Sequence, residues 1–448
     1  MKQLWLGIDC ATQSARGTLI DSAGFIHSRI SHDLAPVQRG EDGRLTQDPD
    51  SWTTAINQII SESVQSADQS GAVVAAIAIS ATSGTFVLTD LNGTPIAPAA
   101  MYNDGRAGNP LARAAAIIKE VGKGSYLFAH TPEFVVAHLC GIPLSEVAAD
   151  WSHALKTGVD LTTEQWSESA HSLAAELGIA LPQLVAPGTL LGTTSQHGIP
   201  IYAAMTDGCT AQISVGSSAL GSAVTSLGTT MVIKIVSPKE VSGPGFYSHL
   251  LPDNRWLSGG ASNLGGISFA QHRDEINLWN RKAAEHGPAT TVMYPLVGTG
   301  ERFPISHKEL KKISTAIPES DVDEFRATLE GIAFAERLAY ETLAKAGAPL
   351  TGKLFTVGGG SRSALWNSIR ATVLNRTISI VDESGSDIGA AMIACAAHQG
   401  GNLAKALDEF NSSTAEQVKP TDGEVKMYED RYQEFLSLVA PFQSQEIR

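Results

Sequence analysis

A β-hairpin pattern that occurs twice constrains the fold more than any other feature of the sequence. Leu4 to Asp9 is a short apolar run, Cys10 to Ala15 are small or polar, and Gly17 to Ile20 resume the apolar pattern. Much later in the chain, Ser222 to Leu227 and Met231 to Val236 are apolar runs on either side of a Gly-Thr-Thr turn. Two apolar runs joined by a short turn predict a β-hairpin in each place.

Each predicted hairpin is followed by an apolar strand that ends in small residues. Val73 to Gly84 follows the first hairpin, and Leu354 to Ser363 follows the second. A unit that appears twice in this order is typical of a duplicated two-domain phosphotransferase with a cleft between its domains. Because 448 residues also exceed one ordinary core, we expect an N-terminal domain at residues 1–218 and a C-terminal domain at residues 219–448.

The segments around these strands carry helical patterns. Gln47 to Ala67 has apolar residues close to a 3.6-residue period, which predicts an amphipathic helix. Leu111 to Val121 and Thr163 to Leu177 are also helical in pattern, and we expect residues 110–185 to shape one wall of the cleft without chemistry of their own. The fold class is therefore α/β. Whether the last predicted helix, Val425 to Leu438, packs back on the first domain is left open.

The composition limits the partners and the compartment. The formal net charge is -14 and lysines and arginines do not cluster, so neither nucleic acid nor an anionic membrane surface is an expected partner. The apolar runs are too short to span a bilayer, and the four cysteines form no C-x-x-C pair. These features favour a soluble cytoplasmic protein without zinc or disulfides. A homodimer is an open alternative for its assembly.

The turn of the first hairpin has the residues of a phosphate site. In Gly7-Ile-Asp-Cys-Ala-Thr-Gln-Ser-Ala-Arg-Gly, an aspartate ends a strand and small hydroxyl residues follow. Such a turn can offer backbone N–H groups and a carboxylate to a metal-bound polyphosphate. Asp9 would act on Mg²⁺ through water, and Thr12 on a phosphate oxygen. The alternative is an ordinary Asx-type turn.

A glycine-rich segment follows the strand of the second repeat. Phe355-Thr-Val-Gly-Gly-Gly-Ser-Arg-Ser-Ala-Leu-Trp places three glycines before a helix that begins near Ser363. Glycines there allow a base and ribose to approach the backbone closely, although a purely structural turn is the alternative. Neither the Walker motif nor G-x-G-x-x-G opens a strand–helix unit, which excludes the P-loop and dinucleotide folds.

Thr206-Asp207-Gly208 is the candidate catalytic centre because it lies at the junction of the two repeats. Phosphoryl transfer to a sugar requires a group that holds the attacking hydroxyl and accepts its proton. The carboxylate of Asp207 suits that role, and Gly208 leaves room for a substrate. A lone Asp-Gly pair is otherwise most often a turn.

Three polar side chains of different kinds lie close together in Met101-Tyr-Asn-Asp-Gly-Arg-Ala. Asn103, Asp104 and Arg106 provide the mixture of donors and acceptors that contacts sugar hydroxyls. An alternative of equal weight is a buried ion pair that holds a loop, formed by Asp104 with Arg106 or with Arg16.

In their order along the chain, these segments resemble those of the FGGY carbohydrate kinases, which share the duplicated actin and hexokinase (ribonuclease H-like) fold. The resemblance covers essentially the whole chain. Besides the segments above, it includes Ser226-Leu-Gly-Thr-Thr as the second phosphate segment and the stretch Trp256 to Gly266. It implies a two-domain enzyme that uses ATP and Mg²⁺ to phosphorylate a small sugar.

Within this family, the chain is most similar to the small kinases that were named xylulose kinases but act on D-ribulose. Their pattern Y-P-L-x-x-x-G-E-R-F-P is present as Tyr294 to Pro304. Xylulokinases have G-Q-M-H-G after the third strand, where this chain has Ala81-Thr-Ser-Gly-Thr and lacks the ketose-binding histidine. Ser80-Ala-Thr-Ser is instead similar to the D-A-T-C of ribulokinases. The resemblance implies phosphorylation of the primary hydroxyl of a ketopentose, with D-ribulose favoured over D-xylulose.

The resemblance also implies roles for individual residues. Asp207 would be the catalytic base, with Asp9 and Thr12 as further catalytic residues. The implied sugar contacts are Asp9, Ser83, Asn103, Asp104, Arg106 and Asp207. The implied nucleotide contacts are Thr12, Arg16, Gly228, Thr229, Thr230, Gly260, Gly359, Gly360, Ser363 and Trp366. At Ser363 the related kinases have asparagine.

By this resemblance, ATP with Mg²⁺ would lie on the C-terminal domain and the ketose on the N-terminal domain, and domain closure would exclude water. Another small polyol or ketose kinase is one alternative. An ATP-binding switch without sugar turnover is another, although the cluster of Asn103, Asp104 and Arg106 argues against it.

Overall fold

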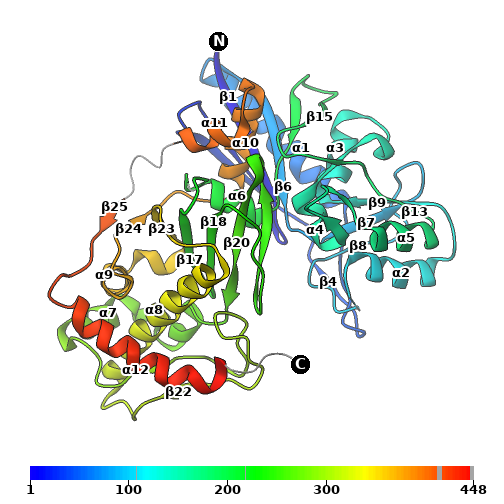
Figure 1. Ribbon diagram of the computed structural model, residues 1–448. Helices are drawn as coiled ribbons and strands as arrows, with labels where there is room; N and C mark the ends of the chain where they lie inside the picture. The colour runs from blue at the N-terminus through cyan, green and yellow to red at the C-terminus, as the bar shows by residue number, and fades with distance from the viewer. Residues whose placement is uncertain (107, 217, 411–415, 444–448) are drawn as a thin grey trace. The chain divides into compact units, whose positions relative to one another are not determined.

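The computed structural model describes residues 1–106, 108–216, 218–410 and 416–443 (Figure 1). Contacts divide them into two compact units. The N-terminal unit comprises residues 1–216, 249–253 and 384–410, and the C-terminal unit comprises residues 218–248, 254–383 and 416–443. None of the helices in this described part combines the length and the apolar character that crossing a membrane would require.

The main sheet of the N-terminal unit has the strand order β15-β16-β6-β1-β2-β3. β1, β2 and β3 form an antiparallel meander, β6 is parallel to β1, and β16 is parallel to β6. The first predicted hairpin is therefore confirmed. The bounds are β1 (Lys2–Cys10), β2 (Ser14–Ile20), β3 (Ile26–Asp33), β6 (Ala72–Ala81), β15 (Leu190–Thr193) and β16 (Pro200–Ala203).

The sheet of the C-terminal unit has the order β19-β20-β18-β17-β23-β24-β25. β17, β18 and β20 are antiparallel neighbours, and β23 and β24 continue parallel to β17. The order β20-β18-β17-β23-β24 thus repeats β3-β2-β1-β6-β16 with the same strand directions, which confirms the predicted duplication. The bounds are β17 (Ala223–Leu227), β18 (Met231–Ser237), β19 (Phe246–Leu251), β20 (Arg255–Ser262), β23 (Leu354–Val357), β24 (Ile378–Ile380) and β25 (Glu416–Val418).

Two helices of the N-terminal unit pack on its main sheet. The predicted amphipathic helix is α1 (Asp50–Gln69), which buries Trp52, Ile56 and Ile59. α10 (Ser386–Gln399) packs on β1, β2 and β6 (Figure 1). It approaches so closely that a Cβ atom at Gly7 would lie 1.9 Å from the Asp387 carbonyl oxygen, and only glycine allows that contact.

The chain returns to the N-terminal unit after residue 383, which differs from the predicted division at residues 218 and 219. The reason is α10, whose buried face is rich in alanine and glycine; a Cβ atom at Gly389 would lie 1.9 Å from the Thr210 carbonyl oxygen of α6 (Asp207–Ile213). α11 (Leu403–Glu409) follows α10 in the same unit. The last helix, α12 (Val425–Gln443), belongs instead to the C-terminal unit, where it buries Tyr428 and Phe435.

The N-terminal unit has a second sheet, of strand order β13-β9-β7-β8-β5-β4. Helices that follow residue 110 share a core with it. The predicted helix from Thr163 begins later, at Glu168, because Gln165–Trp166 pair as β12 with β11 (Val159–Asp160), and the Ser167 side chain caps the helix. The bounds are β4 (Gln38–Arg39), β5 (Leu45–Gln47), β7 (Phe86–Thr89), β8 (Ala99–Ala100), β9 (Tyr126–His130), β13 (Ile179–Ala180), α2 (Pro110–Val121), α3 (Thr131–Cys140), α4 (Trp151–Gly158) and α5 (Glu168–Glu176).

The helices of the C-terminal unit pack on one another and share one core with its sheet. Most residues of α8 are buried, and the helix contacts α7, α9 and α12. The bounds are α7 (Ile276–His286), α8 (Asp321–Ala346) and α9 (Ala364–Leu374). Short strand pairs complete the fold: β10 (Ala149–Asp150) with β14 (Leu184–Val185), and β21 (Met293–Tyr294) with β22 (Ile313–Ser314).

Candidate active site

Asp9 lies near the end of β1, where it is in register with Arg16 of β2 and Ser80 of β6. Its side chain is buried, and Oδ1 has no hydrogen-bond partner among the described residues. Burial raises the pKa of Asp9 to about 7, with further contributions from the carboxylates of Asp207 and Asp387. A buried carboxylate oxygen without a donor, close to other carboxylates, has the environment that a divalent cation stabilises.

Asp207 is the first residue of α6, and its half-buried carboxylate is held from two sides. The Gly208 N–H donates to Oδ1 at 2.6 Å, and the Thr206 hydroxyl lies 3.2 Å from the same oxygen. The Thr206 N–H in turn donates to Ser152 Oγ at 2.8 Å, which connects the start of α6 to α4. These bonds fix the orientation of the carboxylate.

Ser83 lies beside the same segment. Its N–H donates to Thr206 Oγ1 at 3.1 Å, and its hydroxyl donates to the His153 carbonyl oxygen at 3.2 Å. The structure therefore brings Ser83 and Asp207, two of the predicted sugar contacts, to the two sides of Thr206. Ser83 is buried, so a ligand could reach only a small part of its side chain.

A buried histidine supports this region from α4. His153 Nδ1 is bonded to Asp150 Oδ2, and the Ala81 N–H donates to His153 Nε2 at 3.1 Å. Because Nε2 accepts a hydrogen bond, the proton of the neutral imidazole is on Nδ1, facing the carboxylate. Both ring nitrogens of His153 are therefore used within the protein. The pair lies within residues 110–185, to which the sequence assigned no chemistry.

The polar cluster after Met101 forms the ion pair that was one of its two predicted alternatives. Arg106 donates to Asp104 through Nε at 3.0 Å and through a terminal nitrogen at 2.7 Å. The backbone N–H groups of Leu45 and Arg106 also donate to the Asp104 carboxylate, which is fully buried. Asp104 and Arg106 thus hold the loop together, whereas the Asn103 side chain is exposed.

Thr12 and Arg16 belong to the turn of the first hairpin and to β2, within the N-terminal unit. Thr12 is half-buried, and its carbonyl oxygen accepts a hydrogen bond from Gln47 Nε2 at 2.9 Å. The Arg16 side chain is exposed, and its charge lowers the pKa of Asp9 against the larger effect of burial.

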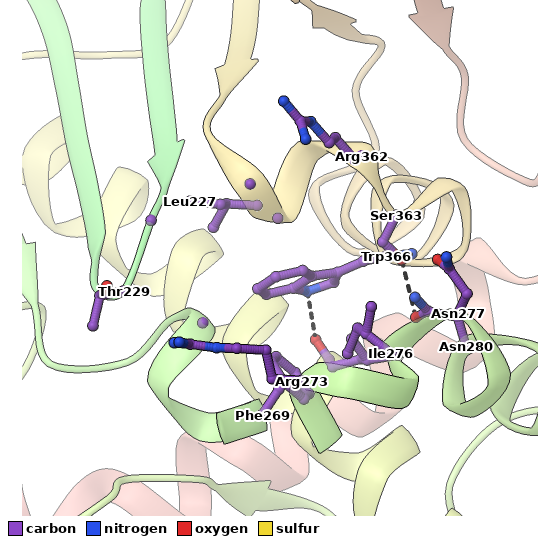
Figure 2. Close-up of a pocket in the computed structure, with 15 residues that line it drawn as sticks. Leu227, Thr229, Phe269, Arg273, Ile276, Asn277, Asn280, Arg362, Ser363 and Trp366 are labelled. Carbon is purple, nitrogen blue, oxygen red and sulfur yellow. Dashed lines mark hydrogen bonds between the residues drawn. The ribbon is translucent and has the colours of Figure 1, made fainter. Parts of the chain in front are cut away.

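The C-terminal unit has a cavity of ≈ 380 Å³ beside its glycine-rich segment (Figure 2). Three kinds of residues line it: apolar side chains, glycines, and polar side chains that include two arginines. They are Leu227, Phe269, Ile276, Leu329 and Trp366; Gly228, Gly266, Gly359 and Gly360; and Thr229, Arg273, Asn277, Asn280, Arg362 and Ser363.

The indole of Trp366 forms part of the cavity wall, and hydrogen bonds fix it there. Its Nε1 donates to the Leu329 carbonyl oxygen of α8 at 3.1 Å. Ser363 caps α9 by accepting a bond from the Trp366 N–H at 3.2 Å, and its hydroxyl donates to Asn280 Oδ1 at 3.1 Å. Figure 2 shows Asn277, Asn280 and Ser363 grouped on one side of the indole, with Thr229 and Leu227 on the other.

Close backbone contacts shape the cavity at its glycines. The Gly266 N–H donates to the Gly228 carbonyl oxygen at 2.8 Å, which holds the turn of the second hairpin against the start of the 3₁₀-helix η3 (Gly266–Glu275). A Cβ atom at Gly360 would lie 2.7 Å from Trp366 Cζ3 and 2.8 Å from Leu227 Cβ, whereas one at Gly359 would meet no atom within 4 Å. Gly360 thus allows tight packing, and Gly359 leaves open space.

Comparison with known proteins identifies the family of the chain. Residues 4–132 match the N-terminal domain of the FGGY family of carbohydrate kinases, and residues 223–398 match the C-terminal domain of that family. The chain belongs to the FGGY family of carbohydrate kinases. The predicted two-domain FGGY fold and the predicted enzyme class, a carbohydrate kinase, are thereby confirmed.

Relatives of this FGGY kinase include proteins named xylulose kinase. That of Staphylococcus epidermidis is 23% identical over 443 residues, with 88% of each chain covered. A xylulose kinase structure from Rhodospirillum rubrum has a TM-score of 0.84 at 21% identity and covers 98% of this chain and 99% of that one. Glycerol kinase from Plasmodium falciparum has the same TM-score at 17% identity and covers 99% of each.

The FGGY motifs account for part of the cavity. Of the ten residues predicted to contact a nucleotide, Gly228, Thr229, Gly359, Gly360, Ser363 and Trp366 line it. Thr230 and Gly260 do not, and Gly260 is buried in β20, where a Cβ atom would lie 2.8 Å from Phe303.

The motifs missed the residues that η3 and α7 contribute to the cavity. Arg273, Asn277 and Asn280 lie outside every motif, but their spacing puts them within two turns of one another. In the N-terminal unit, His153, Lys156 and Asp387 were missed in the same way. Asp387 accepts a hydrogen bond from the Thr18 hydroxyl and affects Asp9 electrostatically.

Proposed function

We propose that this FGGY kinase transfers the γ-phosphoryl group of ATP to the primary hydroxyl of a ketopentose, with D-ribulose as the favoured substrate. The products are a pentulose 5-phosphate and ADP. The observation that carries the proposal is the environment of Asp207, a half-buried carboxylate oriented by Gly208 and Thr206 and electrostatically coupled to the partnerless carboxylate of Asp9.

The cavity of the C-terminal unit is proposed to bind ATP. Its volume of ≈ 380 Å³ is within the usual range of small-molecule sites, and Trp366, Phe269 and Leu227 supply the apolar surface for a base. The hydrogen bond from Ser363 occupies Asn280 Oδ1, which leaves the Asn280 amide N–H groups as donors to a base edge. Arg273 and Thr229 are candidates for phosphate contacts.

Asp9 is proposed to hold Mg²⁺. The residues fit the ion, since Asp9 Oδ1 lacks a donor and the pKa of about 7 reflects a carboxylate whose charge is not yet compensated. Mg²⁺ retains several waters and binds through one or two carboxylates together with substrate phosphates, so a single protein carboxylate is sufficient. When bound, Mg²⁺ would neutralise negative charge on the transferring phosphoryl group.

Asp207 is proposed to act as the base. Its carboxylate would hold the sugar hydroxyl and accept the proton while the hydroxyl oxygen bonds to the γ-phosphorus and the bond to the β-phosphate oxygen breaks. The hydrogen bonds to Oδ1 keep that oxygen in place and leave the other for the hydroxyl. The reaction also requires the reacting oxygen and phosphorus to be within about 3–3.5 Å of each other in the ternary complex.

The preference for D-ribulose rests on the segment after β6, Ala81-Thr-Ser-Gly-Thr, which has no histidine. His153 lies close to this segment but cannot take the place of the missing ketose-binding histidine, because Asp150 and the Ala81 N–H occupy both of its ring nitrogens. D-Xylulose is the second candidate, and the names of the relatives favour it. Thr12, Arg16, Thr230 and Asn103 remain proposed contacts of ATP or sugar.

The direct test is ADP release by the purified protein with ATP and Mg²⁺, measured in parallel with D-ribulose, D-xylulose, L-ribulose, glycerol and no sugar. The proposal predicts release that depends on a ketopentose, fastest with D-ribulose. Faster release with D-xylulose would select the second candidate. Release that no sugar stimulates would contradict both.

A further inference from the structure

Lys156 lies outside all of the FGGY motifs. It is a cation in the polar region around Asp207. It is in the last turn of α4; the residue is exposed, but the end of its side chain is partly buried against Ser83. Nζ donates to the Ser83 carbonyl oxygen at 3.1 Å and lies 6.0 Å from the centre of the Tyr102 ring. Tyr102 is itself 41% exposed, so a ligand can reach both side chains.

The ammonium group of Lys156 is held without an ion pair. Among the described residues, Lys156 forms no ion pair, and the Ser83 carbonyl oxygen is the one acceptor of a hydrogen bond from Nζ. Since an ammonium has three N–H donors, two are available to a ligand. Desolvation and the charge of Arg113 lower the pKa of Lys156, and the carboxylate of Asp207 opposes them. A ligand oxygen with high electron density would balance the positive charge of this ammonium group.

The backbone around Lys156 connects it to the proposed base. Ser83 accepts from Lys156 through its carbonyl and donates through its N–H to Thr206 Oγ1, and the Thr206 hydroxyl lies 3.2 Å from Asp207 Oδ1. The aliphatic part of the Lys156 side chain packs against the backbone at Gly84, where a Cβ atom would lie 3.2 Å from Lys156 Cδ. The carboxylate of Asp207 also acts electrostatically on Lys156, so a sugar bound at Asp207 would lie within the field of the Lys156 ammonium.

We propose that Lys156 is a specificity-determining residue that donates a hydrogen bond from Nζ to an oxygen of the acceptor sugar other than the oxygen that is phosphorylated. The inference rests on the proposed function and adds the class of sugar. A charged donor favours an oxygen with high electron density, which a ketose offers as its carbonyl and a sugar acid as its carboxylate. A polyol offers hydroxyls alone, so Lys156 selects ketoses or sugar acids over polyols.

The experiment compares wild type with Lys156→Met, Lys156→Gln and Lys156→Arg, and with Lys123→Met as the control. Lys123 is an exposed lysine of the same unit without a described contact. Initial rates are measured with D-ribulose, D-xylulose, ribitol, xylitol and D-gluconate, and thermal unfolding checks that each variant is folded. Two neutral variants are used so that poor folding of one leaves the other to decide.

The expected result is a KM for the ketopentose about 10- to 100-fold higher in Lys156→Met and Lys156→Gln, as for loss of a hydrogen bond to a charged group. In these two variants the KM for ATP is unchanged and the ratio of ketose to polyol turnover falls. Lys156→Arg recovers part of this ratio. If gluconate is the better substrate and shows the same loss, the carboxylate is the oxygen that Lys156 binds.

Two results would overturn the assignment of Lys156. One is a sugar KM and a ketose preference in both neutral variants that equal those of Lys123→Met. The other is a wild type that phosphorylates polyols as well as ketoses and sugar acids. Failure of the proposed function has a different signature, since the wild type itself would then turn over no ketopentose.

Discussion

The two units share one strand order but differ in the residues that follow their strands. In the N-terminal unit, β1 contains Asp9 near its end, and carboxylates of α6 and α10 influence the pKa of Asp9. In the C-terminal unit, β17 ends at Leu227, and the turn after it borders an apolar cavity walled by Phe269 and Trp366. One copy of the topology thus carries carboxylates at its strand ends, and the other borders a cavity lined in part by aromatic side chains.

This difference teaches that the duplicated scaffold sets where chemistry occurs, while short segments at the strand ends set which chemistry occurs. Substitutions in the N-terminal unit should therefore impair transfer, and substitutions in the C-terminal unit should impair nucleotide binding. A variant that affected the opposite property would break the comparison.

The largest expected effect belongs to Asp207. Asp207→Asn keeps the size of the side chain but removes the proposed base, so we expect kcat to fall about 10³-fold, within the range for general-base catalysis. The KM for ATP and the unfolding temperature should change little. Asp68→Asn, an exposed aspartate of the same unit, is the control. Turnover of Asp207→Asn near that of the control would refute the role of Asp207.

Asp9 should make the stability of the protein depend on pH in the absence of Mg²⁺. Its pKa is raised from 3.8 to about 7 in the folded state, so the folded protein binds the proton more tightly than the unfolded chain does. The resulting stabilisation is present at low pH and is lost as the pH rises through about 7. Between pH 5.5 and 8.5, the free energy of unfolding of wild type should fall by roughly 2 kcal/mol relative to Asp9→Asn.

Urea unfolding of both proteins at several pH values measures this difference. Because Mg²⁺ favours the ionised carboxylate, its addition should reduce the loss in wild type and have less effect on Asp9→Asn. Parallel pH profiles for the two proteins would contradict the raised pKa of Asp9.

Gly360→Ala and Gly359→Ala form a matched pair in the cavity of the C-terminal unit. A methyl group at residue 360 would overlap Trp366 and Leu227, whereas one at residue 359 meets no protein atom within 4 Å. We expect Gly360→Ala to lose about 1–3 kcal/mol of stability and to raise the KM for ATP. Gly359→Ala should retain its stability without ATP, and any effect should appear in ATP affinity, measured by calorimetry. Equal stability of the two variants would contradict the packing described for Gly360.

The smallest expected effect is at Ser363. Ser363→Ala removes the cap of α9, which costs about 1 kcal/mol, and releases Asn280. The KM for ATP should rise roughly fivefold, since one neutral hydrogen bond contributes about 1 kcal/mol. Ser363→Asn should keep the cap. The Ser361 hydroxyl donates to the Gly358 carbonyl oxygen and does not cap α9, so Ser361→Ala serves as a comparison for stability.

The strand scaffold was predictable because each hairpin is local in sequence and its period-2 and apolar patterns are clear. Both hairpins, α1 and the order of the repeat followed from these patterns. The return of α10 to the N-terminal unit was not predictable in the same way, because an alanine-rich helix has no apolar face that identifies its partner. The close contacts of Gly7 with Asp387 and of Gly389 with Thr210 reveal why it packs there.

The candidate site was predictable where a turn or a glycine signals it. Asp9 precedes a turn of small residues, Asp207 precedes Gly208, and Gly359 and Gly360 belong to the glycine-rich segment. His153, Lys156 and Asn280 lie within helices, where a polar residue on its own is indistinguishable from a solvated one until the tertiary contacts are known. The polar cluster at Asn103 shows the reverse case, since Asp104 and Arg106 satisfy each other.

The account's central claim is tested most directly by following the phosphoryl group. Wild type and Asp207→Asn are incubated with ATP, Mg²⁺ and D-ribulose, and the sugar product and ADP are quantified by mass spectrometry and ³¹P NMR. The account predicts one pentulose 5-phosphate for each ADP from wild type and almost none from Asp207→Asn. ADP without a sugar phosphate, or equal sugar phosphate from both proteins, would contradict it.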